Sequence, residues 1–159
     1  MKSTVLLSTI ILALILFSRS QASSPTSGTD NWSDAVKEEI WALEEAYFAN
    51  LYKADYEEVL AIVHSQFLGW PGGVAQPIDK EESARFMKQL VPKPTSSCTF
   101  KIERAGIRLL GEVALTQYVI HINFSDTPGV DKTQSSRITH TWVKEGARWK
   151  LLGGMSQDK

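Results

Sequence analysis

Three side chains of this sequence could carry acid–base chemistry: Glu44, Tyr47 and His140. A histidine changes its charge near neutral pH, so it can act as a base, an acid or a hydrogen-bond donor to a ligand. Glu44 has apolar neighbours, and burial would raise its pKa and make it a candidate base near neutrality. Tyr47 could donate a hydrogen bond into a pocket. Together they are the candidate catalytic residues of an isomerisation, dehydration or cyclisation.

Each of the three also has a purely structural interpretation. His140 could be a wall residue bonded to a neighbour, and Tyr47 could be a core tyrosine whose hydroxyl finds any acceptor. Glu44 would be a solvated acid if its helix were rotated slightly. The sequence leaves these alternatives open.

Aromatic residues accompany these three groups and favour a small-molecule pocket. The side chains expected to contact a small apolar or aromatic molecule are Trp41, Tyr47, Phe48, Trp70, Tyr118, His140 and Trp142. The alternative is that the tryptophans among them are core residues.

The composition argues against several other classes of function. The chain has three histidines and one cysteine, Cys98, without the spacing of metal ligands, so we expect no metal. It has no Gly-rich phosphate loop, nucleophile elbow or Cys–His pair, and we expect no cofactor. The absence of a basic run argues against nucleic acid as a partner.

The first 22 residues have the features of a signal peptide. Lys2 precedes an apolar run from Val5 to Phe17, and small residues lead to an expected cut after Ala22. The run is shorter than the roughly 20 apolar residues of a spanning helix, although an uncleaved signal anchor is the alternative. We therefore expect a secreted or periplasmic protein without a membrane contact after cleavage. Cleavage removes Lys2 and Arg19, which leaves 15 basic and 18 acidic residues.

Residues 23–32 are rich in Ser, Thr, Gly and Pro, which predicts a flexible tether. Residues 33–159 then form one domain, because that length is enough for one core and not for two. Its first segment, from Ser33 to Ala54, has helical periodicity with two apolar stripes, and Glu44 falls between them. One stripe contains Val36, Ile40, Leu43, Tyr47 and Leu51, and the other contains Trp41, Phe48 and Tyr52. We expect a sheet to enclose so aromatic a helix.

Two Asp-x-x-Glu pairs predict the N-termini of two further helices. The pairs are Asp55 with Glu58, and Asp79 with Glu82. The first of these helices is expected to end near His64, where a histidine suits the negative end of the helix dipole. A short strand is expected at 67–70, and prolines in 91–94 break the last helix.

From Cys98 to Ser156 apolar and polar residues alternate with a period of two, which predicts antiparallel strands. Glycines mark two turns and one kink: Gly111, Gly146 and Gly106. A polar loop is expected over 125–134. The final hairpin places His140 and Trp142 on one face of its first strand. Helices first and strands later predict an α+β domain.

Three local strings, with their order and spacing, resemble a known fold. They are Ala54-Asp55 with Glu58, Phe67-Leu68-Gly69-Trp70-Pro71, and Thr139-His140-Thr141-Trp142 followed by Gly146, Trp149 and Lys150. Over about Asp34 to Ser156 the chain resembles the nuclear-transport-factor-2-like (NTF2-like) superfamily. That superfamily includes ketosteroid isomerase, SnoaL-type polyketide cyclases and the association domain of a calcium/calmodulin-dependent kinase. The resemblance implies a cone-shaped, curved antiparallel sheet wrapped around an N-terminal helix.

The resemblance implies the pocket of ketosteroid isomerase but not its chemistry. Tyr47 lies eight residues before Asp55, the place of the tyrosine that donates to the oxyanion in the isomerase. Trp70, before Pro71, occupies the place of the general base, and Trp cannot abstract a proton. The supporting acid is also missing, because residues 138–140 contain none. We therefore do not expect enolisation by that route.

Two further positions bear on the pocket. His140 occupies the place of an arginine that lines the pocket of the kinase association domain, so His140 and Trp142 are expected to face inward. Met155 stands where many members of the superfamily have a histidine.

Three functions remain open from the sequence. The first is binding of a small apolar or aromatic molecule, and the second is acid–base catalysis with Glu44 or His140 and Tyr47. The third is assembly, as a homodimer through the outer face of the sheet. That face is expected to contain Leu115, Val119, Thr141 and Val143.

Overall fold

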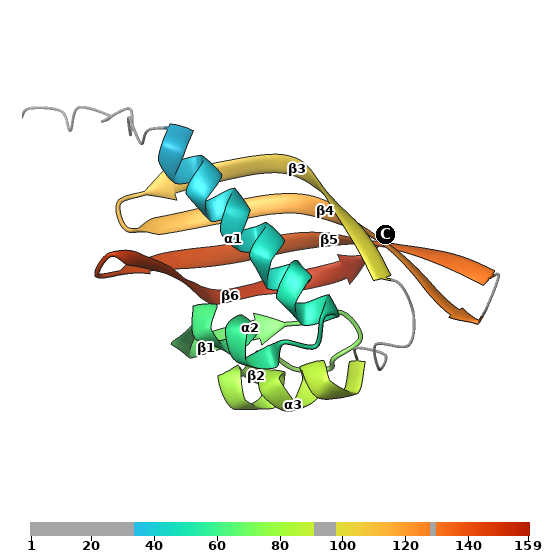
Figure 1. Cartoon of the computed structure of the whole chain (residues 1–159). Coiled ribbons are helices and arrows are strands. Elements are labelled where there is room, and N and C mark those ends of the chain that lie inside the picture. Colours follow the sequence, from blue (N-terminus) through green and yellow to red (C-terminus); the bar gives the residue numbers. More distant parts are fainter. Residues whose placement is uncertain (1–33, 91–97, 128–129) are drawn as a thin grey trace, which may run out of the picture.

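The computed structural model describes residues 34–90, 98–127 and 130–159 (Figure 1). The predicted signal peptide, the cut after Ala22, the tether at 23–32 and the helix break at 91–94 lie outside these residues. Among the described helices, none is long and apolar enough to cross a membrane.

The described chain has the α+β composition that the residue pattern predicts. Its elements are α1 (Asp34–Tyr52), α2 (Tyr56–Ile62), β1 (Val63–Trp70), β2 (Ile78–Asp79), α3 (Lys80–Leu90), β3 (Cys98–Leu110), β4 (Val113–Thr127), β5 (Val130–Glu145) and β6 (Arg148–Asp158).

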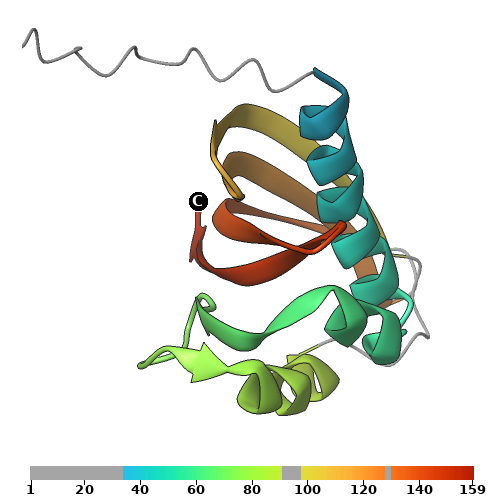
Figure 2. The same ribbon diagram turned by 90° about the vertical axis from the view of Figure 1, so that its left-hand side faces the viewer.

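The strands form one six-stranded sheet in the order β2-β1-β6-β5-β4-β3. Helix α1 runs across one face of this sheet (Figure 1), and the strands curve on that side of it (Figure 2). The curved, unclosed sheet around the N-terminal helix confirms the predicted fold class. One detail differs, because β1 pairs with β6 in parallel while the other neighbours are antiparallel. Strands so distant in sequence need no hairpin, so either direction is open to them.

The two apolar stripes of α1 pack into two clusters between the helix and the sheet. Ile40 belongs to the first cluster, with Trp142 and Leu151, and is fully buried. Trp41 and Phe48 belong to the second cluster, which also contains Tyr118, Ile120 and Ile138. Because both stripes face the sheet, Glu44 between them is fully buried as well.

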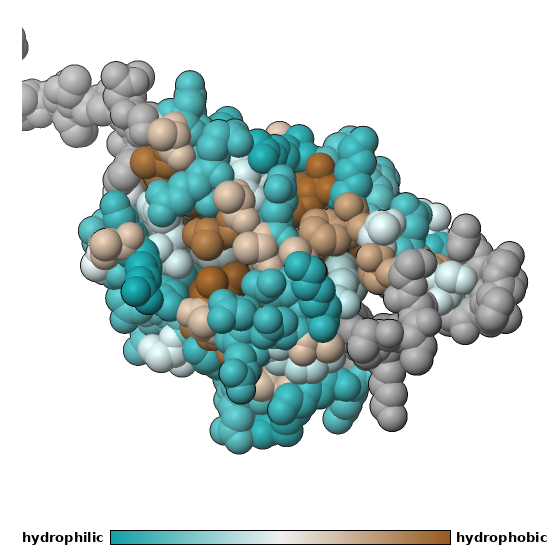
Figure 3. Space-filling view, in the orientation of Figure 1, coloured by the Kyte–Doolittle hydropathy of each residue, from teal (hydrophilic) through white to brown (hydrophobic). Residues whose placement is uncertain are grey.

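Figure 3 views the molecule from the α1 side. Hydrophilic side chains cover most of the helices, and apolar side chains reach the surface in patches between α1 and its neighbours. At the surface, Arg104 of β3 contacts two glutamates and a tryptophan of α1. Its Nη1 donates to Glu38 at 2.8 Å, its Nη2 donates to Glu45 at 3.4 Å, and its guanidinium lies 5.1 Å from the centre of the Trp41 ring.

The predicted turns and caps are present. In the helix cap before α3, Glu82 N–H donates to Asp79 Oδ1 at 2.8 Å and Asp79 N–H donates to Glu82 Oε2 at 3.3 Å. Gly111 and Gly146 have positive φ values of 56° and 62° at the two hairpins. The kink expected at Gly106 is a bulge in the pairing of β3 with β4.

Two predicted elements are wrong. His64 lies in β1 and not at a helix end, because α2 stops at Ile62 and Val63 already pairs with Leu151 of β6. The polar loop expected over 125–134 is largely strand, since β4 continues to Thr127 and β5 begins at Val130. Polar residues can form a strand where that part of the sheet does not pack against an apolar layer.

Candidate functional site

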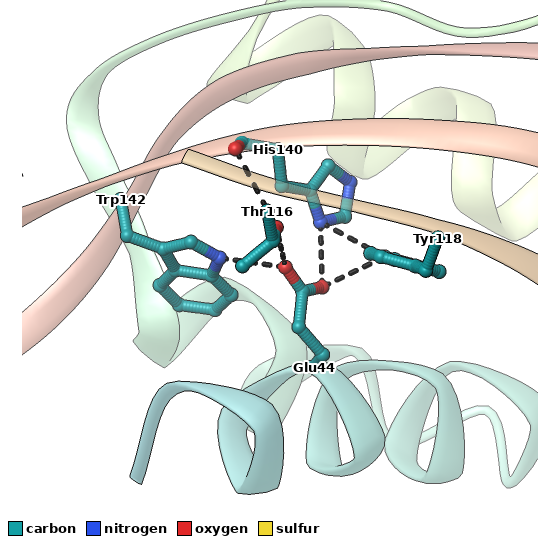
Figure 4. A network of polar contacts seen from close by, with 5 residues as sticks. All are labelled: Glu44, Thr116, Tyr118, His140 and Trp142. Carbon is teal, nitrogen blue, oxygen red and sulfur yellow. Dashed lines mark hydrogen bonds and ion pairs between the residues drawn. The ribbon is translucent and has the colours of Figure 1, made fainter. Parts of the chain in front are cut away.

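Glu44 is the centre of a buried polar network between α1 and the sheet (Figure 4). Its Oε1 accepts from the Thr116 hydroxyl at 2.5 Å and from Trp142 Nε1 at 2.7 Å. Its Oε2 lies 2.7 Å from both the Tyr118 hydroxyl and His140 Nδ1. Each carboxylate oxygen thus has two donors.

Strand alternation and register explain why these donors meet. Thr116 and Tyr118 of β4, and His140 and Trp142 of β5, alternate with outward residues and therefore face α1. In the sheet Thr116 stands opposite His140. Gly154 of β6 flanks His140 on the other side, and a Cβ atom there would lie 2.5 Å from His140 Cδ2. Any residue with a side chain at position 154 would therefore clash with the imidazole ring.

The pKa of Glu44 is lowered, although burial alone would raise it. The positive charge of protonated His140 and the hydrogen bonds from His140, Thr116 and Trp142 together outweigh the burial. The raised pKa expected for a Glu44 buried among apolar neighbours is therefore wrong, because β4 and β5 place four donors around the carboxylate. Glu44 is an ionised acceptor without a free position for a substrate proton.

The network leaves one nitrogen of His140 for a ligand. An ionised carboxylate can only accept, so the Nδ1 that faces Glu44 carries the proton. Nε2 is then an acceptor in the neutral ring and a second donor in the protonated ring. Among the residues that the structure describes, none is hydrogen-bonded to Nε2.

His140 lies in the wall of a cavity of about 180 Å³. Its wall is contributed by α1, by β1 and the turn after it, by α3, and by β5 and β6. The lining residues are Tyr47, Phe48, Leu51, Phe67, Gly69, Trp70, Pro71, Ser83, Phe86, Met87, Ile138, His140, Gly154, Met155 and Ser156.

Tyr47 is the second polar group from the candidate set in this wall. Burial and the negative charge of Glu44 raise the pKa of Tyr47 to about 12. Its hydroxyl therefore stays protonated at neutral pH and can donate. The Tyr47 and His140 rings lie edge to face with their centres 5.5 Å apart.

The structure divides the seven residues predicted to contact a ligand into two groups. Tyr47, Phe48, Trp70 and His140 line the cavity. Trp41, Tyr118 and Trp142 do not line it, and belong to the two core clusters.

Helix α3 contributes lining residues that the sequence analysis missed, namely Ser83, Phe86 and Met87. In the sequence, Phe86 and Met87 were visible as part of the apolar side of the predicted helix. Helical periodicity does not show which part of the protein such a side packs against.

The three candidate catalytic residues take different roles. Glu44 orients His140, holds a proton on its Nδ1 and is a positioning residue, while His140 and Tyr47 line the cavity. The site therefore offers an imidazole nitrogen and a phenol hydroxyl as its polar groups. Within the described residues no group of three or more His, Cys, Asp or Glu side chains could hold a metal ion.

The lowered pKa of Glu44 predicts a pH dependence of stability. Folding favours the ionised form, so its contribution is complete above the ordinary pKa of 4.5 and is lost as the pH falls through the lower folded-state value. We expect the difference in free energy of unfolding between wild type and Glu44→Gln to become smaller as the pH falls below 4.5. Urea denaturation at pH values on both sides of 4.5 measures this difference.

Most other titrating groups cancel in that comparison. Glu103, whose pKa is lowered by a hydrogen bond from His121, is exposed and present in both proteins, so its contribution cancels. Tyr47 and Tyr118, whose pKa values are raised by burial and by Glu44, stay protonated in both proteins at acid pH. A difference that stays constant until both proteins unfold in acid would contradict the prediction.

The family model of the calcium/calmodulin dependent protein kinase II association domain matches residues 36–154 of this chain. No curated protein matches this chain. A similar solved structure is the association domain of this kinase from C. elegans, with 18% identity, a TM-score of 0.65, and coverage of 78% of this chain and 96% of that chain.

Two further structures are similar. The kinase hub of S. rosetta has 15% identity and a TM-score of 0.63, and covers 76% of this chain and 94% of that chain. An NTF2-like protein from Cytophaga hutchinsonii has 14% identity and a TM-score of 0.60, and covers 77% of this chain and 98% of that chain. At these identities the likeness shows the fold alone, and it confirms the NTF2-like resemblance of the sequence.

Proposed function

The chain belongs to the family of the calcium/calmodulin dependent protein kinase II association domain, and we propose that this member binds a small, mainly apolar molecule in the cavity beside His140. The observation that carries the proposal is the fixed His140 ring in a mainly apolar wall, with Nδ1 held by Glu44 and Nε2 without a partner among the described residues. Apolar cavities with a few convergent polar groups are typical of ligand sites.

The size of the cavity limits the ligand. About 180 Å³ is close to the roughly 150 Å³ of an engineered apolar cavity that binds benzene, and is below the several hundred Å³ of sites for drug-sized molecules. A molecule of one ring with a small substituent fits this volume, and a steroid does not.

A cavity-filling variant tests binding. Ser83 is buried in the wall on α3, so Ser83→Phe should fill the cavity and abolish binding. At about ten times its Kd, a ligand adds about 1.4 kcal/mol of stability. This should raise the Tm of wild type by about 5 °C. Thermal unfolding with and without one-ring compounds measures the shift.

The matched control is Gln89→Phe, which adds the same side chain on the exposed side of α3. It should keep the ligand-induced shift of wild type. The proposal fails if no one-ring compound shifts wild type, or if Ser83→Phe retains the full shift while remaining folded.

A second function, self-association, is favoured by the sheet face away from α1. Ala114 and Thr116 of β4 face α1 and are fully buried, so Val113 and Leu115 point to the opposite side, which we call the outer sheet face. They are 40% and 38% exposed, and Leu110 at the adjoining end of β3 is 77% exposed. Large exposed apolar residues grouped in this way are typical of protein interfaces.

The outer sheet face also fits the relatives, two of which are described as an association domain and a hub. In the register of β4 with β5, Thr141 and Val143 stand opposite Leu115 and Val113 and extend the apolar strip. We propose a homodimer, or a larger assembly of identical copies, through this face.

A charge in the apolar strip tests assembly. Leu115→Lys should shift the protein to a monomer, because a buried lysine in an interface has no partner for its charge. The control, Ala42→Lys, adds the same charge at an exposed position of α1 and should leave the mass unchanged. Light scattering coupled to size-exclusion chromatography measures the mass, and a wild type that is monomeric at high concentration would exclude assembly.

A further inference from the structure

We infer that a second copy of this chain covers the mouth of the cavity in the assembled protein, so that self-association slows the exchange of a bound molecule. This coupling rests on the proposed self-association and on the proposed ligand binding, and it connects the two. It depends on where the exposed apolar residues lie and on which of them also belong to the cavity wall.

In the described part of the chain, the large apolar residues that are exposed share the outer sheet face. Phe67 of β1 packs against the core, so Leu68 points away from α1, and Trp70 does the same by alternation. Met155 of β6 pairs with Trp70 and therefore lies on the same face. The exposed residues are Leu68, Trp70, Leu110, Val113, Leu115 and Met155.

The pairing of the strands joins these residues into one strip. A single row across β1, β6, β5 and β4 runs through Leu68, Gly153, Thr141 and Leu115. Neither of the two middle residues carries a charge. The exposed apolar residues of β1 and β6 are therefore continuous with those of β4, where the proposed interface lies.

The usual size of an interface indicates that a partner covers the whole strip. A stable interface buries about 800 Å² on each partner, which corresponds to a patch about 16 Å in radius. Neighbouring strands are about 4.8 Å apart, so Met155 is about 10 Å and Trp70 about 15 Å from Leu115 across the sheet. An interface of this size centred on Leu115 reaches both residues.

Trp70 and Met155 also belong to the cavity wall. They are 45% and 56% exposed, whereas Phe48 and Met87 of the same wall are buried. Exposed wall residues mark the place where the cavity meets the solvent. A partner copy that covers Trp70 and Met155 therefore closes this mouth.

Oxidation by hydrogen peroxide tests the covered surface without any ligand. Peroxide transfers an oxygen atom to the sulfur of an exposed methionine, which gives the sulfoxide and water. Met155 should be oxidised several-fold more slowly in assembled wild type than in the Leu115→Lys monomer. Met87, which is buried, is the internal reference. Mass spectrometry of peptides measures both rates, and dilution of wild type to the monomer should speed the oxidation of Met155 in the same way.

The variant Leu68→Lys tests the extent of the interface by mass. Leu68 is 60% exposed and does not belong to the cavity wall, and it lies three strands from Leu115. A lysine covered by a partner loses its hydration, so Leu68→Lys should weaken association at least about tenfold. Ala42→Lys is again the control and should associate like wild type. Light scattering over a concentration series measures the association.

Toluene is the probe for exchange. Because a covered mouth must open before a bound molecule leaves, toluene should leave assembled wild type at least about tenfold more slowly than the Leu115→Lys monomer. Leu115 is not part of the cavity wall, so the variant keeps the site itself. Exchange spectroscopy by NMR measures the two rates.

The outcomes separate the inference from the proposals below it. A monomeric wild type would exclude the proposed self-association and the coupling with it. If Met155 is protected but toluene binds to neither protein, the covered surface stands, and the ligand binding and the coupling fail. If wild type assembles while Met155 stays as reactive as in the monomer, if Leu68→Lys associates like wild type, or if toluene leaves both proteins at the same rate, the coupling is overturned.

Discussion

Replacing Glu44 by alanine is expected to lower the free energy of unfolding by about 3–5 kcal/mol, the range for removing one partner of a buried ionic pair. The loss is large because Thr116, Tyr118, His140 and Trp142 all direct donors at this carboxylate. Without it, these donors stay buried with no acceptor, at about 1–3 kcal/mol for each one that water cannot reach. Urea denaturation followed by tryptophan fluorescence measures the change.

Glu45→Ala is the matched control, since it removes the same side chain one residue further along α1. The Glu45 side chain is 56% exposed and its contact is with Arg104 at 3.4 Å, so its loss should change stability by less than about 0.5 kcal/mol. Glu44→Gln keeps the shape of the side chain but turns an NH₂ group toward two donors, and should be destabilised as well. Equal stabilities of Glu44→Ala and Glu45→Ala would show that the buried network does not form.

Replacing Trp142 by alanine should cost about 3–5 kcal/mol, the range for deleting a large aromatic side chain from a core. Trp142 is fully buried in the cluster that joins α1 to β5 and β6, and its Nε1 also donates to Glu44. The variant loses apolar contacts and one of the four hydrogen bonds to the carboxylate. The same urea titration measures the effect.

Two variants separate these contributions. Trp142→Phe keeps most of the apolar contact and loses the donor, so it should cost less than Trp142→Ala but more than about 1 kcal/mol. Trp70→Ala deletes the same side chain at a position that is 45% exposed, and should cost about 1 kcal/mol. If Trp142→Ala were no more destabilising than Trp70→Ala, Trp142 would not be a core residue.

In this chain the buried acid of α1 is surrounded by donors and serves to orient His140. The same pair of residue types could act as a catalytic base if the carboxylate had an open position. A fold therefore does not transfer a reaction, because the reaction depends on which lone pairs remain free.

The residue pattern was enough to predict the α+β layout, and the family resemblance added the curved sheet around the first helix and the inward face of the last hairpin. The two stripes of α1 correctly placed Ile40 and Trp41 against the core. Alternation placed His140 and Trp142 on one face of β5, and the resemblance correctly assigned that face as the inward one. The helix caps and the glycine turns were equally predictable. All of these depend on local geometry, since periodicity and capping are set by residues within a few positions of one another.

Only the tertiary structure decided the roles of the polar and aromatic residues. The position of Glu44 between two stripes was visible in the sequence, but its four donors come from strands 72 to 98 residues away. Their convergence depends on the crossing of α1 over the sheet and on the register of β4 with β5. In the same way, packing separates the core residues Tyr118 and Trp142 from those in the cavity wall. A pKa, a free lone pair and a cavity are sums over neighbours in space, and the order of residues along the chain does not specify those neighbours.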